Sequence, residues 1–267
     1  MTTGDLAAAV LLAVFVRAVA SGQPTSHSPP RPLGLEDLVS RMMERDRART
    51  AALKSYFSLR RYALENKRFG TRAEITVRMT FEQPRKKAFE VLSEKGSGLI
   101  RKRVLRRLIQ AEVDTTNEKS YAATDITPAN YTFRLAGTRT EQDRVYYLLE
   151  ALPKRQDKYL FRGLIWIDPE DFAIARIEGS PAQNASFLIK KTTFVHMYGK
   201  FGQSWLPVSN KSDTDVRIFG RTSVTVEYYG YQVDEHPLPV LTGRVAETPD
   251  GTVGKAAGNG VRPEFKP

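Results

Sequence analysis

The stretch from Gly163 to Gly179 reads GLIWIDPEDFAIARIEG, and it decides the fold class. Two apolar runs flank the turn residues Asp168–Asp171. Pro169 presets its backbone φ for the second position of a turn, and the Asp168 side chain can accept a backbone hydrogen bond. The stretch therefore predicts a β-hairpin. Because Leu164–Ile167 is apolar at every position, we expect both faces of the sheet to be covered there.

Alternation of apolar and polar residues extends this sheet along the chain and is clearest from Ala73 to Phe81. A strand with one buried and one wet face belongs to an antiparallel sheet, since strands of a parallel sheet are covered on both faces. Further short runs bounded by turn residues predict a sheet of about eleven strands in total. The other runs are Ser55–Leu64, Lys87–Leu92, Tyr131–Leu135, Arg144–Leu152, Tyr159–Ile167, Phe172–Ile177, Phe187–Tyr198, Ser204–Ser209, Val216–Phe219 and Val224–Val233.

Two segments break this rhythm with helical spacing, and they could cover the sheet. Apolar residues recur between Leu35 and Met43, which predicts an amphipathic helix of about 18 residues. The second helix should extend from Leu99 to about Val113. Its opposite face is basic, which indicates either a solvated surface or a surface that docks on anionic membrane headgroups. The basic residues are Arg101, Lys102, Arg103, Arg106 and Arg107.

Both ends of the chain differ in composition from its centre. Residues 1–20 contain the unbroken apolar run Leu6–Val16, which predicts a cleavable secretory signal peptide. A helix that stays at the membrane or packs into the core is the alternative for this segment. Residues 21–34 predict a Pro- and Ser-rich linker, and residues 237–267 predict a disordered tail. The folded domain should then extend over residues 35–236 of an exported, periplasmic protein.

Composition and missing motifs exclude several chemistries. The absence of cysteine excludes disulfides, thiolate metal sites, cysteine nucleophiles and a lipid-bearing N-terminal cysteine. The three histidines, His27, His196 and His236, lack the short spacing of helical zinc sites. No nucleophile elbow, phosphate-binding loop or zinc-protease motif is present, and no nucleic-acid-binding module accompanies the net charge of +11. We therefore expect a protein that is not an enzyme, holds no metal or cofactor, and binds no nucleic acid.

The order of these features along the chain resembles that of a known protein family. The hairpin reads G-x-I-W-I-D-x-x-D-F-x-I-x-R-I-E-G, one amphipathic helix precedes the sheet, and a second interrupts it. This pattern resembles the periplasmic lipoprotein carrier superfamily (LolA/LolB-like), and more narrowly the outer-membrane lipoprotein-sorting protein group. The similarity covers residues 35–233. Further matching residues are Asn130–Phe133, Pro153–Gly163, Ser204–Val208 and Phe219–Arg221.

The resemblance implies a mainly β (α+β) fold, a curved antiparallel incomplete β-barrel plugged by two amphipathic helices. It also implies an apolar concave face that takes up lipid acyl chains, and a strand arginine of special importance. Arg60, Arg61 and Arg78 all remain candidates for that arginine. Without cysteine, the chain cannot be the lipid-anchored acceptor type. The residues that we place at the cavity, which would be core side chains in any other β fold, are Leu38, Met42, Val77, Met79, Phe81, Leu164, Trp166, Val224 and Val226.

Our leading hypothesis is a monomeric periplasmic carrier that shelters acyl chains of a lipid or lipoprotein and serves outer-membrane lipoprotein sorting or lipid transport. The basic helix would be its gate or its membrane-docking surface. The alternative is an envelope structural or sensing module that binds a protein partner through the same fold. A concave face filled by side chains would favour that alternative. A hydrolase ranks third, since it would need a buried acid–base pair in a cleft.

Overall fold

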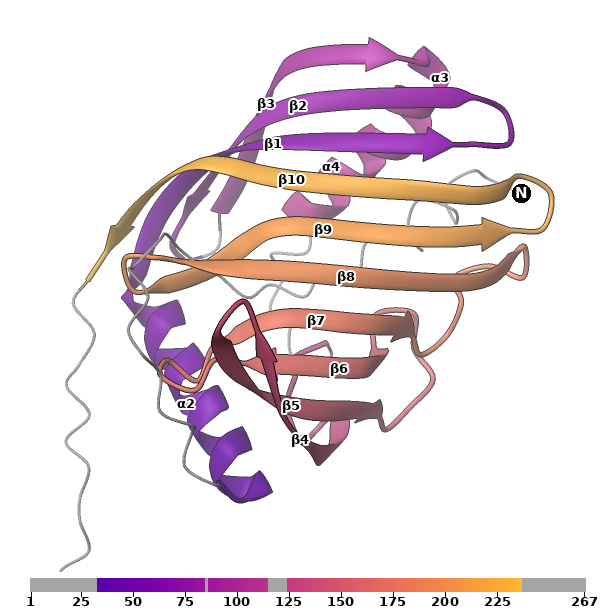
Figure 1. Ribbon diagram of the computed structural model, residues 1–267. Coiled ribbons are helices and arrows are strands. Elements are labelled where there is room, and N and C mark those ends of the chain that lie inside the picture. Colours follow the sequence, from indigo (N-terminus) through magenta and orange to yellow (C-terminus); the bar gives the residue numbers. More distant parts are fainter. Residues whose placement is uncertain (1–32, 85, 115–123, 237–267) are drawn as a thin grey trace, which may run out of the picture.

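A curved sheet of ten antiparallel strands forms the body of the protein within residues 33–84, 86–114 and 124–236, which the computed structural model describes (Figure 1). The strand order is β3-β2-β1-β10-β9-β8-β7-β6-β5-β4. Strands β3 and β4 are the two edges of this order, so the sheet remains an open, incomplete barrel. The predicted fold class is confirmed.

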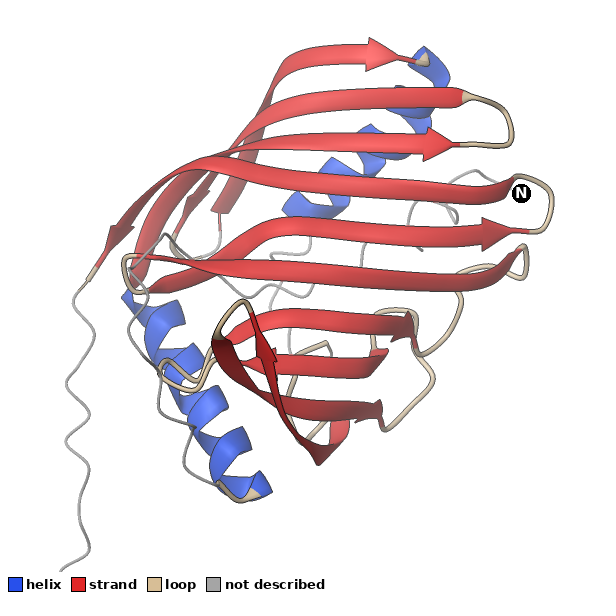
Figure 2. Cartoon of the chain, viewed as in Figure 1, coloured by secondary structure: helices blue, strands red, loops and turns tan. Residues whose placement is uncertain are grey.

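Two helical regions accompany the sheet (Figure 2). Helix α2 (Leu35–Ala52) leads directly into β1, whereas α3 (Gly98–Ile100), the π-helical turn η1 (Arg101–Leu105) and α4 (Arg106–Asp114) follow β3. Because β3 and β4 lie at opposite edges, the chain between them has to pass from one edge to the other. The strands are β1 (Leu53–Asn66), β2 (Thr71–Glu82), β3 (Lys86–Gly96), β4 (Tyr131–Glu141), β5 (Arg144–Pro153), β6 (Phe161–Ile167), β7 (Ile174–Pro181), β8 (Ile189–Phe201), β9 (Ser204–Val216) and β10 (Gly220–Glu235).

The hairpin predicted from the first motif joins β6 and β7. Gly163 lies directly opposite Gly179, and a Cβ atom on Gly163 would stand 2.0 Å from the Glu178 carbonyl oxygen. The close approach of the two strands therefore requires glycine there. In the turn, Asp168 Oδ1 accepts hydrogen bonds from the backbone N–H groups of Glu170 and Asp171, at 3.1 and 2.9 Å. The turn chemistry expected of Asp168 is confirmed.

The outer face of this hairpin is covered, but side chains cover it instead of a helix. Trp166 is only 2% exposed, although it faces away from the helices. The guanidinium groups of Arg139 and Arg176 lie 5.3 and 4.8 Å from its ring centre, and Tyr146 meets it edge to face. Stacked arginines can bury an aromatic ring because their planar faces are weakly hydrated. At Trp166 the expected coverage of both faces is confirmed, but side chains supply it on the outer face in place of the helices that the sequence offered.

The strand count corrects one further detail. Residues 216–219 were predicted as a separate strand, but Val216 ends β9 and residues 217–219 form the turn before β10. Strand β9 extends well beyond Ser209, and its inward residues Ser212 and Thr214 are buried although they are polar. Apolar alternation fails there, so the sequence divided one strand into two.

Some predictions fall outside the described residues. These are the signal peptide, nearly all of the linker and the C-terminal tail, so the proposed domain limits stay predictions. Within the described residues, no helix is long and apolar enough to cross a membrane.

Candidate functional site

The concave face of the sheet carries two separate apolar clusters, each covered by a different helix. Residues Leu38, Val39 and Met42 of α2 belong to a cluster with side chains of β1, β2 and β4–β9. Residues Leu105, Leu108 and Ile109 of η1 and α4 pack on β1, β2 and β10. The sheet residues of this second cluster, which we call the α4 cluster, are Tyr62, Leu64, Ala73, Ile75, Val77, Met79, Val224, Val226 and Tyr228.

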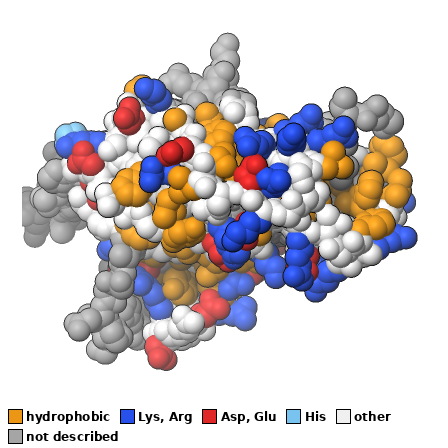
Figure 3. All heavy atoms as spheres, turned by 90° about the horizontal axis from the view of Figure 1, so that it is seen from above, with side chains coloured by type: hydrophobic (Ala, Val, Ile, Leu, Met, Phe, Trp, Pro, Cys, Tyr) orange, Lys and Arg blue, Asp and Glu red, His pale blue; other side chains and the backbone are white. Residues whose placement is uncertain are grey.

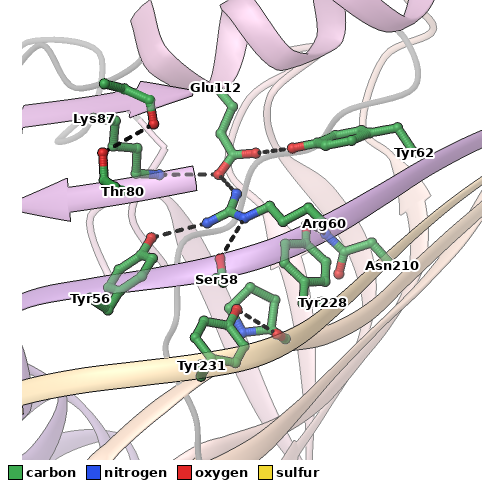
Figure 4. Close-up of polar contacts among 12 residues, drawn as sticks. Tyr56, Ser58, Arg60, Tyr62, Thr80, Lys87, Glu112, Asn210, Tyr228 and Tyr231 are labelled. Carbon is green, nitrogen blue, oxygen red and sulfur yellow. Dashed lines mark hydrogen bonds and ion pairs between the residues drawn. The ribbon is translucent and has the colours of Figure 1, made fainter. Parts of the chain in front are cut away.

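Helix α4 is anchored to the sheet by a buried charged group (Figure 4). The Glu112 carboxylate forms an ion pair with Arg60 of β1 and accepts a hydrogen bond from Lys87 of β3 at 3.2 Å. Its second oxygen accepts a 2.9 Å hydrogen bond from the Tyr62 hydroxyl. One carboxylate on the apolar side of the helix thus joins two strands. We call Arg60, Tyr62, Lys87 and Glu112 the α4 anchor.

Electrostatics keep the Glu112 carboxylate ionised although it is buried. Burial disfavours the charged form of Glu112, but Arg60, Lys87 and the hydrogen bond from Tyr62 outweigh it and lower the Glu112 pKa to about 2. For Lys87, burial lowers the pKa, and the attraction of Glu112 opposes this shift. Arg60 and Lys87 thus both face one carboxylate in the interior. Such pairs are rarely more stable than apolar packing, so the α4 anchor specifies a position more than it adds stability.

Arg60 is the strand arginine that faces the helix. Its Nε donates to Ser58 Oγ at 3.1 Å, its Nη2 donates to Tyr56 at 3.2 Å, and it lies over the Tyr228 ring. Arg61 and Arg78 point to the outer face, where they pair with glutamates of the neighbouring strands. Of the three candidates from the sequence, only Arg60 is buried on the concave face.

Helix α2 is anchored differently, through the β6–β7 turn. Arg49 near its C-terminus is 5% exposed and donates to the Asp171 carbonyl oxygen at 2.7 Å. The Asp171 carboxylate in turn accepts hydrogen bonds from Trp205 Nε1 at 2.8 Å and Lys200 Nζ at 3.0 Å. The D-P-E-D-F turn of the first motif thus links α2 to β8 and β9.

A cavity of about 580 Å³ opens beside α2, next to the start of β4. This volume is in the range that small-molecule sites occupy. Its walls mix apolar and charged side chains, so it suits a ligand with an apolar part and a polar end. The described residues that line it are Leu35, Glu36, Val39, Ser40, Met43, Glu44, Arg47, Pro128 and Phe133.

The nine residues predicted for the cavity separate into three groups, and none of them lines this opening. Leu38, Met42 and Phe81 belong to the α2 side of the core. Val77, Met79, Val224 and Val226 belong to the α4 cluster. Leu164 and Trp166 alternate with the inward Ile165 and Ile167, so they face the outer side of the sheet. A lipid-contacting role for these nine residues stays a prediction.

The predicted basic helix face is present but is partly neutralised. Arg101 and Arg106 both pair with Glu94 of β3. Lys102, Arg103 and Arg107 are exposed. The charge that is available to a partner is therefore smaller than the sequence suggests.

Polar residues also cross the concave face between the two clusters. His196 of β8 lies opposite Asn210 of β9, and Asn210 donates to the Tyr228 hydroxyl at 2.8 Å. His196 is 4% exposed, burial lowers its pKa to about 4, and its Nδ1 atom has no hydrogen-bond partner. A neutral histidine inside the barrel is therefore expected at neutral pH. Among the described residues, no group of three or more metal-ligating side chains converges.

Sequence reasoning missed Glu112, Lys87 and His196. A signal for Glu112 does exist, since it continues the helical stripe of Leu105, Leu108 and Ile109 and thus places a carboxylate on the apolar face. Arg60 likewise occupies an inward position in the alternation that contains Tyr62 and Leu64. A charge at an inward position on two elements suggests a buried pair, although the sequence does not show that the two elements meet.

Comparison with solved structures finds likenesses of low identity. A domain from Vibrio parahaemolyticus named for outer membrane lipoprotein sorting is 14% identical, with 79% of this chain and 94% of that chain covered and a TM-score of 0.40. A DUF1329 family protein from Desulfovibrio piger is 10% identical, with 75% and 93% covered and a TM-score of 0.41. A LolA superfamily protein from Nitrosomonas europaea is 10% identical, with 77% and 96% covered and a TM-score of 0.36. These likenesses concern the fold alone and leave the ligand open.

A search of curated proteins gave no match. A family model, described as a family of unknown function, matches residues 58–233, from within β1 to within β10. The chain belongs to this family, DUF5686.

Proposed function

We propose that this protein is an envelope carrier without catalytic activity that binds an acyl chain of a lipid or lipoprotein on its concave face. One observation carries the proposal: a helix, and not a second sheet, covers the apolar half of that face between β2 and β10. A helix that only plugs a sheet can be displaced without breaking a strand pair. An acyl chain would then take the place of Leu105, Leu108 and Ile109 against the α4 cluster.

The transfer energy is large enough for such an exchange. Burial of an acyl chain contributes about 0.8 kcal/mol per methylene, or about 10 kcal/mol for a dozen. Displacement of α4 exposes the apolar side chains of the helix, and this cost offsets part of the gain. The α4 anchor has to open in this exchange, and hydration of the released Glu112 carboxylate offsets part of the lost ion pairing. The cavity beside α2 could hold the polar end group of the lipid or admit the acyl chain.

The test starts with the protein expressed as the full chain and purified, and then delipidated. We expect a fluorescent fatty acid to bind at one site per chain, and organic extracts of the undelipidated protein to contain a lipid by mass spectrometry. Glu112→Gln should accelerate probe binding, because it loosens α4. Arg78→Ala removes an exposed pair with Glu90 on the outer face and is the matched control.

Two further outcomes divide the possibilities. If Met43→Trp, which fills the cavity beside α2, abolishes binding while Glu112→Gln has no effect, the site is that cavity and not the α4 cluster. If no probe binds and no lipid is extracted, the carrier proposal is wrong.

A second function is favoured by the packing of the concave face. Side chains of helices α2 and α4 fill much of this face. A filled concave face is what we expect of an envelope structural or sensing module that binds a protein partner. Such a module would keep α4 closed in all states. Identical hydrogen-exchange protection of α4 before and after addition of fatty acid would support it over the carrier.

A further inference from the structure

Exposed apolar side chains gather at the tips of three neighbouring strand connections. Phe69 lies in the β1–β2 turn, Phe187 in the β7–β8 loop, and Ile218 and Phe219 in the β9–β10 turn. Their exposed fractions are 56%, 68%, 59% and 44%, respectively. Large apolar residues at this exposure on adjacent tips form a patch, which single scattered residues would not. We call these four residues the tip cluster.

Specific contacts hold the tip cluster together. The rings of Phe69 and Phe219 meet edge to face with their centres 6.2 Å apart. Arg68 Nη1 donates to the Ile218 carbonyl oxygen at 3.1 Å, and Arg217 Nε donates to the Phe187 carbonyl oxygen at 3.1 Å. The three tips are thus tied into one surface, which loses little conformational freedom when a partner covers it.

The tip cluster is surrounded by positive charge. Residues 67–70, 187–191 and 217–220 contain five basic residues and no acidic residue. Behind the tips, the carboxylates of Glu65 and Asp213 already pair with arginines of the strands. Asp215 of β9 lies opposite Lys191, so one further carboxylate is near the five cations, and positive charge remains in excess around the exposed aromatic and aliphatic side chains. The five basic residues are Lys67, Arg68, Lys190, Lys191 and Arg217.

The whole arrangement lies at one end of the curved sheet. In Figure 1 the turns after β1 and β9, the start of β8 and helix α3 are all at the right-hand end. Figure 3 shows hydrophobic side chains at that end with Lys and Arg around them. Leu99 of α3, which is 62% exposed, adds a further apolar side chain at the same end.

We propose that the tip cluster docks this protein on the surface of an anionic phospholipid bilayer. The phenylalanines and Ile218 enter the region between headgroups and acyl chains, while the surrounding lysines and arginines contact lipid phosphates. Aromatic and aliphatic side chains favour this interface, and each basic residue near an anionic leaflet adds electrostatic attraction. A second copy of the chain fits less well, because two such ends would bring ten cations together. The proposal depends on the exposed tips alone and holds whether or not the concave face binds lipid.

The test uses the purified full chain and vesicles of phosphatidylcholine with or without phosphatidylglycerol. We expect co-sedimentation with the anionic vesicles only, weakened by salt. Phe69→Ser combined with Phe187→Ser should reduce the binding constant at least about tenfold. The matched control combines Leu92→Ser with Leu135→Ser, because these side chains are each 42% exposed but lie within β3 and β4.

Two further double variants test the contribution of the basic residues to vesicle binding. Lys67→Gln with Lys190→Gln should weaken binding at least about tenfold. Lys86→Gln with Lys211→Gln removes the same charge elsewhere and should leave binding within about twofold, since distant charges are screened. Unchanged thermal melting of all four double variants would show that they fold.

Insertion can be measured directly because both natural tryptophans are buried, Trp166 at 2% and Trp205 at 3% exposure. In Phe69→Trp, the new fluorescence should shift to the blue with anionic vesicles and be quenched by brominated lipid. Leu92→Trp should show neither effect. Equal vesicle binding by the tip variants and the wild type, no blue shift, or concentration-dependent dimers that these variants abolish would each overturn the proposal.

Discussion

Arg60 of β1 and Glu112 of α4 form an ion pair with both side chains at most 5% exposed, and this pair ties a helix to the centre of the concave face. Lys87 brings a second cation to the same carboxylate from β3. The helix position therefore depends on a polar contact inside an otherwise apolar cluster. The effects of changing this contact can be predicted.

Removal of the negative charge from the α4 anchor should destabilise the protein strongly. Glu112→Gln keeps the shape of the side chain but removes the negative charge that Arg60 and Lys87 contact in the interior. The expected loss in the free energy of unfolding is about 3 kcal/mol, measured by urea denaturation at neutral pH. Arg78→Ala breaks an exposed pair and should cost about 0.5 kcal/mol or less. A similar small effect for both variants would show that α4 is held by its apolar side chains alone.

Stability should fall as the pH drops below about 6.5, because His196 is buried in its neutral form. The pKa of His196 is lowered to about 4, so between these values the unfolded chain binds a proton that the folded chain does not. The stabilisation is complete above the unfolded pKa and is lost progressively toward the folded one, by up to about 3 kcal/mol.

His196→Phe should flatten the stability profile between pH 6.5 and 4, which urea denaturation at a series of pH values can measure. His236 shares no buried environment of this kind and provides the control, His236→Phe, which should retain the slope. Parallel profiles for the wild type and His196→Phe would mean that another group causes the acid sensitivity.

Glu112 should produce a second loss of stability at lower pH. Its pKa is lowered to about 2, below the value of an unfolded glutamate, so its contribution is present above that unfolded value and is lost as the pH falls toward about 2. Glu112→Gln lacks this lower phase but should keep the one due to His196. Loss of both phases together would contradict the assignment.

The β6–β7 pair should not tolerate a side chain at Gly163. A Cβ atom there would stand 2.0 Å from the Glu178 backbone oxygen, so the strands would have to separate. We expect Gly163→Ala to lower the melting temperature by about 10 °C or to prevent folding, since a shift of paired backbone costs several kcal/mol. Gly34→Ala, where no atom lies within 4 Å of the added Cβ, should be close to neutral. A wild-type melting temperature for Gly163→Ala would show that the strands can move apart easily.

Neutralisation of the exposed basic residues on the second helix tests whether this helix docks on membranes or is only a solvated face. Lys102→Gln, Arg103→Gln and Arg107→Gln change exposed residues, so the melting temperature should remain unchanged. If the helix docks on membranes, binding to phosphatidylglycerol vesicles should weaken by about tenfold or more in a sedimentation assay. Vesicle binding equal to that of the wild type would identify the cluster as a solvated face, with docking left to the tip cluster.

Much of the fold was predictable because residues close together in the sequence determine the type of each element. Alternation from Ala73 to Phe81, turn residues at Asp168 and helical spacing after Leu35 each depend on neighbours in sequence, and each produced the expected element. Prediction failed where inward residues are polar, as at Ser212 and Thr214, and where arginines cover an outward tryptophan. In both places burial is supplied by distant parts of the chain.

By itself, the sequence determined an antiparallel sheet, two amphipathic helices and the excess of positive charge, because period and composition are local properties. Only the tertiary structure decided that Arg60, Lys87 and Glu112 share one buried contact, although they come from three elements up to 52 residues apart. It also brought Phe69, Phe187 and Phe219 to one end of the sheet. Contacts between distant segments depend on strand order and curvature, and neither leaves a periodic trace in the chain.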